Sequence, residues 1–409
     1  MMPEQGNRSD RTLSILLVGG TGTISFDVLK HSLEAGHKVY ILNRGRTKVR
    51  LPDGVLCLHG DVRALKGAGQ ELLGDLHFDV VIDFISFSVS DLSQSLRLFG
   101  NRCRQFIFIS SVGAYDRRHV QGRLDESCPA TGNPVWQYSV DKAACEDFLK
   151  HYQFPAGTFY TIVRPAVTYG DTRIPYGIMP AYGCHWTFLG RMLAGKPVFV
   201  WDHGKATATV MHTLDFARAF IGLFGNPRAE NETFNLCGDE EVAWKDMLSQ
   251  LAAILKCECR IVDVPSEYAE KAMPQIRGIL LGDRALNASY SNQKIKQVCP
   301  DFRITMDLRH GLERTIVYYR EHQFLKGIDY HWDGMIDRML ASYLKKYEPD
   351  SPMLSKLVFY DYLGTATLKD RFSYLRSRYI PYQIQYAYES LMRAFWRMEN
   401  RLFRRQGTD

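Results

Sequence analysis

The sequence predicts an α/β fold in which helices cover both faces of a doubly wound parallel sheet. Three observations support this prediction. Short apolar runs typical of buried strands alternate with segments of helical periodicity through the first half of the chain. The first of these runs, residues 15–18, leads directly into a glycine-rich turn and then into a helix. The 409 residues are 45% hydrophobic and 23% charged, as in ordinary globular proteins.

The glycine-rich turn predicts a site for a dinucleotide. Gly19 and Gly22 follow the first strand, and the next helix ends near Gly36. Glycine allows tight backbone angles and a close approach to a pyrophosphate, which the free N–H groups of a helix N-terminus attract. An ordinary strand-to-helix turn is the alternative, but the order of strand, glycines and helix favours the cofactor site. We therefore expect Gly19, Gly22, Thr23 and Ile24 to bind the cofactor.

The turn after the second strand, residues 37–42, indicates which dinucleotide is bound. An NAD site usually has Asp or Glu about 20 residues beyond the glycines, where it accepts hydrogen bonds from ribose hydroxyls. This chain has Asn43 there, followed by Arg44 and Arg46. An arginine can pair with a 2′-phosphate, and no carboxylate in the turn repels that phosphate. We therefore favour NADP over NAD; the alternative is a basic turn that is only solvated.

The carboxyl ends of the next strands supply further candidate residues. The third strand, 55–59, is followed by Asp61 and Val62, and the fourth, 79–84, ends at Phe84. Asp61 either accepts a hydrogen bond from the adenine amino group or caps the next helix. Because ligands of parallel sheets bind at the carboxyl ends of the strands, we expect Asp61, Val62 and Phe84 to contact the cofactor.

A serine, a tyrosine and a lysine carry the predicted chemistry. Ser111 follows the fifth strand, 106–109, and Tyr138 and Lys142 are spaced to share one face of a predicted helix. An ammonium group beside the phenol, together with a positive nicotinamide ring, should lower the pKa of the tyrosine. The phenol could then exchange a proton with an alcohol or a carbonyl whose oxygen the serine hydroxyl holds. This spacing alone is a weak signal, and the dinucleotide motif upstream strengthens it.

With these motifs the chain resembles the extended short-chain dehydrogenase/reductase superfamily, which includes nucleotide-sugar epimerases and dehydratases. Ser111, Tyr138 and Lys142 match its catalytic triad. The first two glycines match its glycine motif, in which Ser25 replaces the third glycine. Pro165 ends a strand that resembles the family's entry into the substrate lobe, and we take it as a cofactor contact. The resemblance covers residues 12–322 and includes the segments 159–170, 210–217 and 233–238.

The residues after the serine narrow the reaction that the resemblance implies. Family members that carry out 4,6-dehydration place Asp and Glu directly after the serine or threonine, whereas this chain has Val112 and Gly113. Dehydration is therefore disfavoured. We expect an NAD(P)-dependent oxidoreductase or epimerase that acts on a secondary alcohol or ketone, above all of a nucleotide-activated sugar. The alternatives are a ketoreductase with a non-sugar substrate and a dinucleotide-fold protein that binds RNA or another partner.

The resemblance also divides the chain into three parts. Residues 12–170, completed by 206–237, should form a dinucleotide-binding Rossmann domain. Residues 171–205 and 238–323 should form a smaller α/β substrate lobe, and 324–409 a helical C-terminal extension.

The stretch from residue 170 to 205 is rich in glycine, proline and aromatic residues, so we expect it to be loop-like. It forms either a substrate lid or a packed insertion. Arg173, Arg191 and Lys205 in this stretch are either solvated or meet a diphosphate.

The tail after residue 357 mixes aromatic residues with arginines. From residue 386 onward, Leu391, Phe395, Met398 and Leu402 fall on one stripe of a predicted helix. We favour helices that pack on the core or on a sister subunit. Docking on an anionic membrane surface or a carrier protein, and contact with nucleic acid, are the alternatives.

The Asn43–Arg46 turn looks closest to a branch that contains chloroplast stem-loop RNA-binding proteins and bacterial epimerase-like enzymes.

The bulk properties favour a cytoplasmic enzyme with a small anionic ligand. The net charge of +6 suits an anionic substrate or cofactor but does not by itself argue for nucleic acid. No apolar run approaches the roughly 18 residues of a membrane span, so we expect no transmembrane segment. The nine cysteines form no metal-binding pattern and fit a reducing compartment. We expect a homodimer with no metal and no stable nucleic-acid partner.

Overall fold

The computed structural model describes residues 11–45, 49–65, 69–120, 122–322 and 327–381, together with residues 384 and 387. This described part divides into two compact units. The first unit consists of the described residues up to Pro175, Ala206–Trp244 and Leu281–Tyr318. The second consists of Tyr176–Lys205, Lys245–Leu280 and the described residues from Tyr319 onward.

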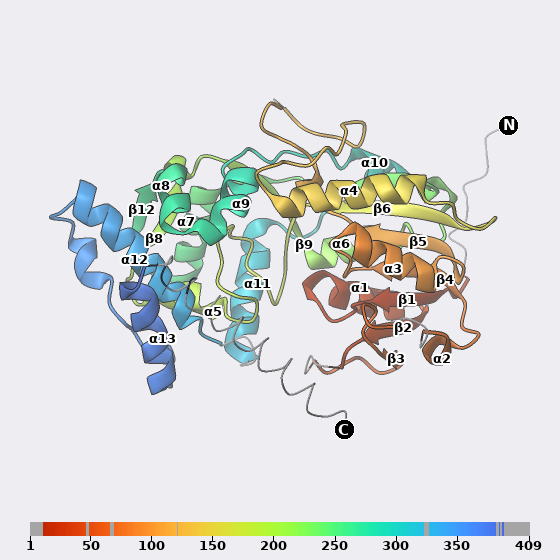
Figure 1. Cartoon of the computed structure of the whole chain (residues 1–409), viewed down its shortest axis with the longest axis horizontal. Coiled ribbons are helices and arrows are strands. Elements are labelled where there is room, and N and C mark those ends of the chain that lie inside the picture. Colours follow the sequence, from red (N-terminus) through yellow and green to blue (C-terminus); the bar gives the residue numbers. More distant parts are fainter. Residues whose placement is uncertain are drawn as a thin grey trace, which may run out of the picture. The chain divides into compact units, whose positions relative to one another are not determined.

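A seven-stranded parallel sheet forms the centre of the first unit (Figure 1). Its strand order is β10-β6-β5-β4-β1-β2-β3. The order reverses direction between β1 and β4, and ligands of such sheets bind at this reversal point. The predicted doubly wound fold is therefore confirmed. The strands are β1 (Ser14–Val18), β2 (Lys38–Asn43), β3 (Leu56–His59), β4 (Phe78–Asp83), β5 (Cys103–Ile109), β6 (Phe159–Pro165) and β10 (Glu232–Leu236).

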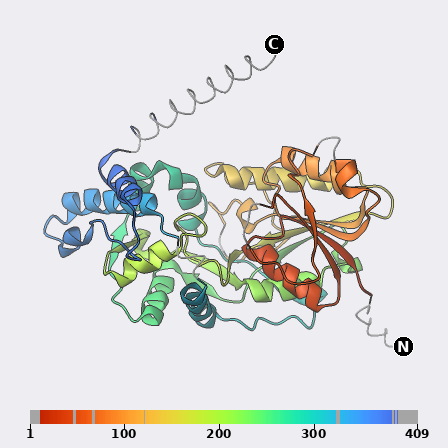
Figure 2. The same cartoon turned by 90° about the horizontal axis from the view of Figure 1, so that it is seen from below.

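Helices cover both faces of this sheet, as Figure 2 shows. Successive side chains of a strand point to opposite faces, so one strand serves two hydrophobic cores. In β1, Ile15 and Leu17 pack in the core that includes α1 (Thr23–Glu34) and α6 (Thr213–Ile221). Leu16 and Val18 pack in the other core, which includes α3 (Val89–Phe99) and α4 (Gln137–His151). The continuous apolar run of β1 therefore reflects burial on both sides.

Smaller elements complete the first unit. A three-stranded sheet has the order β11-β9-β7. These strands are β7 (Val167–Tyr169), β9 (Thr207–His212) and β11 (Glu241–Ala243), and the further helices are α2 (Gly69–Leu73), α10 (Gln293–Val298) and α11 (Leu308–Glu321, as far as Tyr318).

The unit boundaries differ from the expected ones, because residues 238–244 and 281–318 cluster with the first unit and not with the substrate lobe. β11 pairs with β9. The backbone N–H of Thr209 in β9 donates to the carbonyl oxygen of Ala288. These main-chain bonds hold both segments to the first unit.

The second unit joins the rest of the lobe to the C-terminal extension. Its two strands, β8 and β12, pair in parallel. Its elements are α5 (Trp186–Leu193), β8 (Val198–Trp201), α7 (Trp244–Leu255, from its second residue), β12 (Ile261–Val264), α8 (Ser266–Ala272), α9 (Arg277–Ile279), α12 (Tyr330–Tyr347) and α13 (Leu368–Tyr379).

The expectation that residues 170–205 are loop-like is wrong, because α5 and β8 both lie in this stretch. Phe188, Leu189 and Met192 of α5 are buried, and all four residues of β8 are buried. Glycines and prolines surround these short elements, so their apolar patterns are too short to be recognised in the sequence. The buried elements match the packed-insertion interpretation of this stretch.

A buried cluster of charges ties α5 to α12 within the second unit. Arg191 forms ion pairs with Asp333 at 2.5 Å and Asp337 at 2.6 Å. Lys196 pairs with the same two carboxylates at 2.8 and 2.7 Å. All four side chains are at most 3% exposed. Arg191 is therefore neither solvated nor available to a diphosphate, which corrects both interpretations of this residue.

Among the helices that the structure describes, none is long and apolar enough to cross a membrane.

Candidate active site

The glycine-rich turn has the backbone geometry of a pyrophosphate site. Gly19 has a φ of 89°, and a Cβ atom there would collide with the side chain of Ile85. Gly22 is the N-cap of α1, which begins at Thr23. The first N–H groups of a helix have no partner within the helix and carry the positive end of its dipole. The turn therefore fits the diphosphate of a dinucleotide.

Ser25, which replaces the third glycine of the family motif, closes this turn. Its hydroxyl donates a hydrogen bond to the carbonyl oxygen of Gly19 at 2.9 Å. The Ser25 hydroxyl oxygen in turn accepts the N–H of Gly22 at 2.8 Å. The side chain is only 2% exposed. The serine thus stabilises the turn from within and does not block its outer surface.

The residues predicted to select NADP lie at the ends of β2 and β3. Asn43 ends β2, and its side-chain oxygen accepts the N–H of Gly45 at 2.9 Å. The guanidinium of Arg44 lies 4.0 Å from the carboxylate of Asp61, and both side chains are partly exposed. Asp61 also accepts the N–H of Arg63 at 3.1 Å. This bond closes a local turn, and α2 begins only at Gly69, so Asp61 is not its N-cap. Arg46 lies outside the described residues.

The remaining predicted cofactor residues lie at the same edge of the sheet or next to it. Phe84 directly follows β4, and its ring centroid lies 6.4 Å from that of Phe220. Pro165 is the last residue of β6. Val62 is 3% exposed and is part of the hydrophobic core. Ile24 packs partly buried against the core on the other face.

Ser111, Tyr138 and Lys142 come together at the carboxyl end of β5. The Ser111 hydroxyl accepts the N–H of Gly113 at 2.9 Å and forms a hydrogen bond with the Tyr138 phenol. Tyr138 and Lys142 both lie on α4. The Lys142 ammonium nitrogen is 6.0 Å from the centre of the Tyr138 ring. The catalytic role of the three residues stays a prediction, but their proximity is a feature of the structure.

Lys142 links two segments at the sheet edge. Its ammonium group donates to the carbonyl oxygens of Ser86 and Ile109, each at 2.8 Å. It also lies over the rings of Phe87 and Phe108, at 4.8 and 4.7 Å from their centroids. The side chain is 2% exposed. Lys142 is thus held in one position by four neighbours.

Burial shifts the pKa values of both Tyr138 and Lys142. Burial raises the pKa of Tyr138, and this effect exceeds the opposing effects of Ser111 and Arg173. Burial lowers the pKa of Lys142 to about 8, against the attraction of carboxylates such as Asp83. The protein alone therefore does not show the expected lowering of the Tyr138 pKa, and the lowering by a bound nicotinamide stays a prediction. The phenol is neutral around pH 7, and the lysine titrates just above it.

Asp83, which the sequence analysis missed, fixes the carbonyl group that Lys142 contacts. It ends β4 and is completely buried. Its carboxylate accepts the N–H groups of Ile85 and Ser86, both at 2.9 Å, and the Ser86 hydroxyl at 2.6 Å. An acidic residue at the end of an apolar strand was the signal that could have identified it.

Asn133, Trp136 and Ser139, which were also missed, contact the beginning of α4 or lie in it. The Ser139 hydroxyl donates to the carbonyl oxygen of Gly113 and accepts the N–H of Asn133 at 2.7 Å. The ring centroid of Trp136 lies 4.8 Å from that of Tyr138. A Cβ atom on Gly113 would lie 3.0 Å from the Trp136 ring, so a larger residue would crowd it. These contacts define the surroundings of the Tyr138 phenol.

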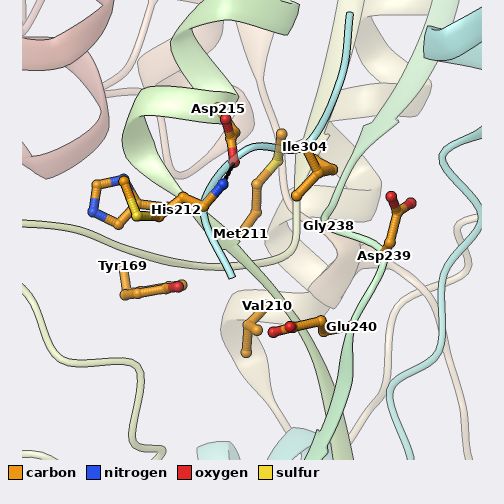
Figure 3. A pocket seen from close by; sticks show the side chains of 10 residues that line it. Tyr169, Val210, Met211, His212, Asp215, Gly238, Asp239, Glu240 and Ile304 are labelled. Atoms are coloured by element: carbon orange, nitrogen blue, oxygen red, sulfur yellow. Dashed lines mark hydrogen bonds between the residues drawn. The ribbon is translucent and has the colours of Figure 1, made fainter. Parts of the chain in front are cut away.

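A small pocket lies elsewhere in the first unit (Figure 3). Its polar groups already have roles in the fold. The Asp215 carboxylate accepts hydrogen bonds from Thr305 and from the N–H of Met306. The His212 ring nitrogen accepts the N–H of Leu214 and so caps α6. The pocket is lined by Tyr169, Val210, Met211, His212, Asp215, Gly238, Asp239, Glu240, Ile304 and Met306, and it contains none of the predicted catalytic residues.

Comparison with known proteins identifies the family. Residues 15–237 match the model of the NAD dependent epimerase/dehydratase family, which is more than half of the chain. The chain belongs to this family. The predicted resemblance to extended short-chain dehydrogenases/reductases is thereby confirmed, and family membership supports a nicotinamide dinucleotide as cofactor.

Individual members of the family show how far the similarity extends. The chain is 25% identical over 271 residues to 2′-dehydrokanamycin reductase of Streptomyces kanamyceticus, covering 64% of this chain and 72% of that protein. It is 26% identical over 251 residues to chloroplast stem-loop binding protein of 41 kDa b from Arabidopsis thaliana. That alignment covers 58% of this chain and 62% of the relative, which is less than two thirds of its length.

Solved structures show the same fold. The structure of UDP-glucuronic acid 4-epimerase from Bacillus cereus, in complex with UDP-glucuronic acid and NAD, superposes with a TM-score of 0.59 at 18% sequence identity. The superposition covers 75% of this chain and 99% of that one.

Proposed function

We propose that this protein transfers a hydride between a nicotinamide dinucleotide and a sugar carbon that bears a hydroxyl or keto group. The observation that carries the proposal is the meeting of Ser111, Tyr138 and Lys142 at the carboxyl end of β5. The glycine turn lies at the carboxyl end of β1 in the same parallel sheet. When bound, the nicotinamide would supply or accept the hydride. The chain's own residues would then have to bind the substrate oxygen and transfer its proton.

Tyr138 is the proposed acid and base. Because its pKa is raised by burial, the phenol carries its proton at neutral pH and is ready to donate it to a carbonyl oxygen. In ketone reduction the carbon gains the hydride and the oxygen gains the phenol proton, which gives an alcohol and the oxidised dinucleotide. In the reverse direction the phenolate takes the proton back. The Ser111 hydroxyl positions the same oxygen.

Lys142 is proposed to favour the phenolate when it forms. Its ammonium nitrogen lies 6.0 Å from the centre of the Tyr138 ring, and both residues are on α4. Charge–charge attraction falls with distance, and burial increases it because little water screens the two groups. The bonds to Ser86 and Ile109 keep this cation in place.

The proposed cofactor is NADP, with NAD as the alternative. Arg44 directly follows β2, where an NAD-binding protein commonly has an acidic residue. Its guanidinium is about half exposed and so is accessible to a 2′-phosphate. Asp61, at 4.0 Å, holds the guanidinium near the sheet edge and competes for it.

The proposed substrate is a sugar, either nucleotide-activated or part of a larger product. The bound UDP-glucuronic acid in the Bacillus cereus structure favours a nucleotide sugar on the shared fold. The relative named 2′-dehydrokanamycin reductase favours simple reduction of a ketone on a sugar without a nucleotide. Dehydration is disfavoured, because Val112 and Gly113 provide no acid or base and Gly113 is crowded by Trp136.

We also propose a homodimer in a reducing compartment. All nine cysteines are free thiols in the structure. The homodimer follows from the sequence analysis alone, and the native mass of the purified protein tests it. The intact triad argues against a protein that only binds RNA.

The test measures reduced nicotinamide by absorbance with NADPH or NADH and a panel of keto sugars with and without a nucleotide. A second assay follows epimerisation of UDP-sugars without net cofactor change. We expect activity in one assay, and a loss of about 10²–10⁴-fold in the Tyr138→Phe variant. The matched control is Tyr182→Phe, because Tyr182 is an exposed tyrosine outside the triad. Full activity of Tyr138→Phe would reject the proposed mechanism.

A further inference from the structure

The helix α13 exposes a stripe of apolar side chains. Leu368, Phe372, Leu375 and Tyr379 are 88, 68, 41 and 69% exposed. Their spacing of four, three and four residues places them along one side of the helix. A helix of a water-soluble protein normally turns such a stripe toward its core, and a contiguous exposed one marks a contact surface.

Basic residues border this stripe on both sides. With about 100° of rotation per residue, Arg371 and Arg378 lie to one side of it, and Lys369 and Arg376 lie to the other. The only acidic residue of the helix is Asp370. Its carboxylate accepts hydrogen bonds from Thr367 in a capping box. The surface therefore combines apolar and positively charged side chains.

The opposite side of α13 is fixed to α12, so the stripe cannot turn inward by rotation of the helix. The Tyr374 hydroxyl donates to the Asp337 carboxylate at 2.6 Å, and Ser377 bonds to the His331 ring at 2.5 Å. Tyr374 and Ser377 are at most 1% exposed. Gly334 of α12 lets the two helices approach closely, since a Cβ there would lie 2.5 Å from the Tyr374 carbonyl oxygen.

We propose that this face of α13 docks on an anionic lipid surface. A helix that lies in a membrane interface buries an apolar stripe among the acyl chains and places basic residues at the level of the head groups. The four apolar and four basic residues of α13 have this arrangement. Each basic residue near an anionic surface strengthens binding by about fivefold. The enzyme would thus act at the membrane without a spanning segment.

A second copy of the chain suits this face less well. The contact of a two-fold dimer sets the same surface against itself, which would bring the arginines of one α13 against those of the other. Interface cores are instead depleted of charge. The chain beyond residue 381 carries five arginines and three acidic residues, so it adds positive charge and does not neutralise the face. RNA would attract the arginines, but contact with RNA would not bury the exposed leucines against an apolar surface.

The experiment is co-sedimentation of the full chain with vesicles. One set contains equal parts of phosphatidylglycerol and phosphatidylcholine, and the other contains phosphatidylcholine alone. We expect binding to the anionic vesicles only, and release at about 1 M salt, where the Debye length is about 3 Å. Failure of the wild-type protein to bind anionic vesicles overturns the proposal.

Two variants separate this surface from other causes. Leu368→Asp with Phe372→Asp changes two exposed side chains, so folding and reductase or epimerase activity in solution should be unchanged. We expect it to lose at least tenfold in vesicle affinity. The matched control is Val317→Asp, at a residue of α11 that is 49% exposed, and it should bind as the wild type does. The proposal would be contradicted if the two variants bound vesicles equally. It would also be contradicted if the double variant had a lower native mass than the wild type, or if only RNA displaced the protein from the vesicles.

Discussion

Glu146 of α4 and Arg164 of β6 form a fully buried ion pair. The guanidinium of Arg164 donates to the two Glu146 oxygens at 2.9 and 2.6 Å, and both side chains are 1% exposed. Glu146 also accepts the hydroxyl of Ser110 at 2.5 Å. It lies one helical turn after Lys142 on α4, whereas Arg164 lies on β6. The pair therefore fixes α4 to β6, the neighbour of the strand that Ser110 and Ser111 follow.

The first prediction concerns this pair. Glu146→Gln keeps the shape of the side chain but leaves the Arg164 charge buried without a partner. We expect a loss of about 3–5 kcal/mol in the free energy of unfolding, measured by denaturant titration. Glu146→Gln combined with Arg164→Met should recover part of this loss, because no unpaired charge remains. If the single and double variants lose the same free energy of unfolding, the stability of this hydrogen-bond network does not depend on the ion pair.

The second prediction is the pH dependence of activity. Because burial lowers the pKa of Lys142 to about 8, the ammonium group is lost as the pH rises above that value. If the charge is needed, kcat/KM should fall about tenfold per pH unit on the alkaline side. Lys142→Arg keeps its charge at all these pH values and should move the fall to higher pH. A flat profile up to pH 10 would contradict the role of the ammonium group.

The free energy of unfolding should rise with pH over the range in which kcat/KM is expected to fall. The folded-state pKa of Lys142 is below its ordinary value of 10.5, so between about pH 8 and 10.5 the unfolded chain binds more protons than the folded chain. The contribution of Lys142 to the unfolding free energy therefore rises with pH in this window. Compared with Lys142→Met, the wild-type protein should gain about 3 kcal/mol between its two ends, measured by denaturant titration at each pH.

The central sheet could be predicted from the sequence because its strands are local signals. Residues 15–18 are apolar throughout since both faces of β1 are covered, and the following glycines mark where the chain must turn. α5 and β8 could not be predicted in this way. Their burial depends on partners far along the chain, such as Tyr362, which contacts Gly190 of α5.

The prediction of the site also depended on signals that are local in the sequence. Ser111, Tyr138 and Lys142 could be found because their order and spacing are visible in the sequence. Glu146 could not, since its role comes from hydrogen bonds to Arg164 on β6, whereas Asp83 left only a weak signal, an acidic residue at the end of an apolar strand. The direction of the Tyr138 pKa also depends on burial, which spacing does not reveal.

The fourth prediction tests the choice of cofactor. Arg44→Ala removes the guanidinium proposed to pair with the 2′-phosphate. We expect the Kd for NADPH to rise about 10–100-fold, the value of a hydrogen-bonded charge pair, while the Kd for NADH stays the same. Asp61→Asn should tighten NADPH binding, since Asp61 no longer competes for Arg44. Fluorescence titration of the reduced cofactors measures both. Equal weakening of NADPH and NADH by Arg44→Ala would assign Arg44 to general binding and not to selection.

The last prediction concerns the buried charges of the second unit. Arg191, Lys196, Asp333 and Asp337 carry two positive and two negative charges with almost no exposure. Asp333→Asn leaves the cluster with an excess positive charge, so we expect a loss of about 3–5 kcal/mol in unfolding free energy, measured by calorimetry. The matched control is Glu258→Gln, because Glu258 pairs with Arg260 at the surface and is 71% exposed; it should lose at most about 1 kcal/mol. An Asp333→Asn variant as stable as this control would show that the cluster does not hold α12 to α5.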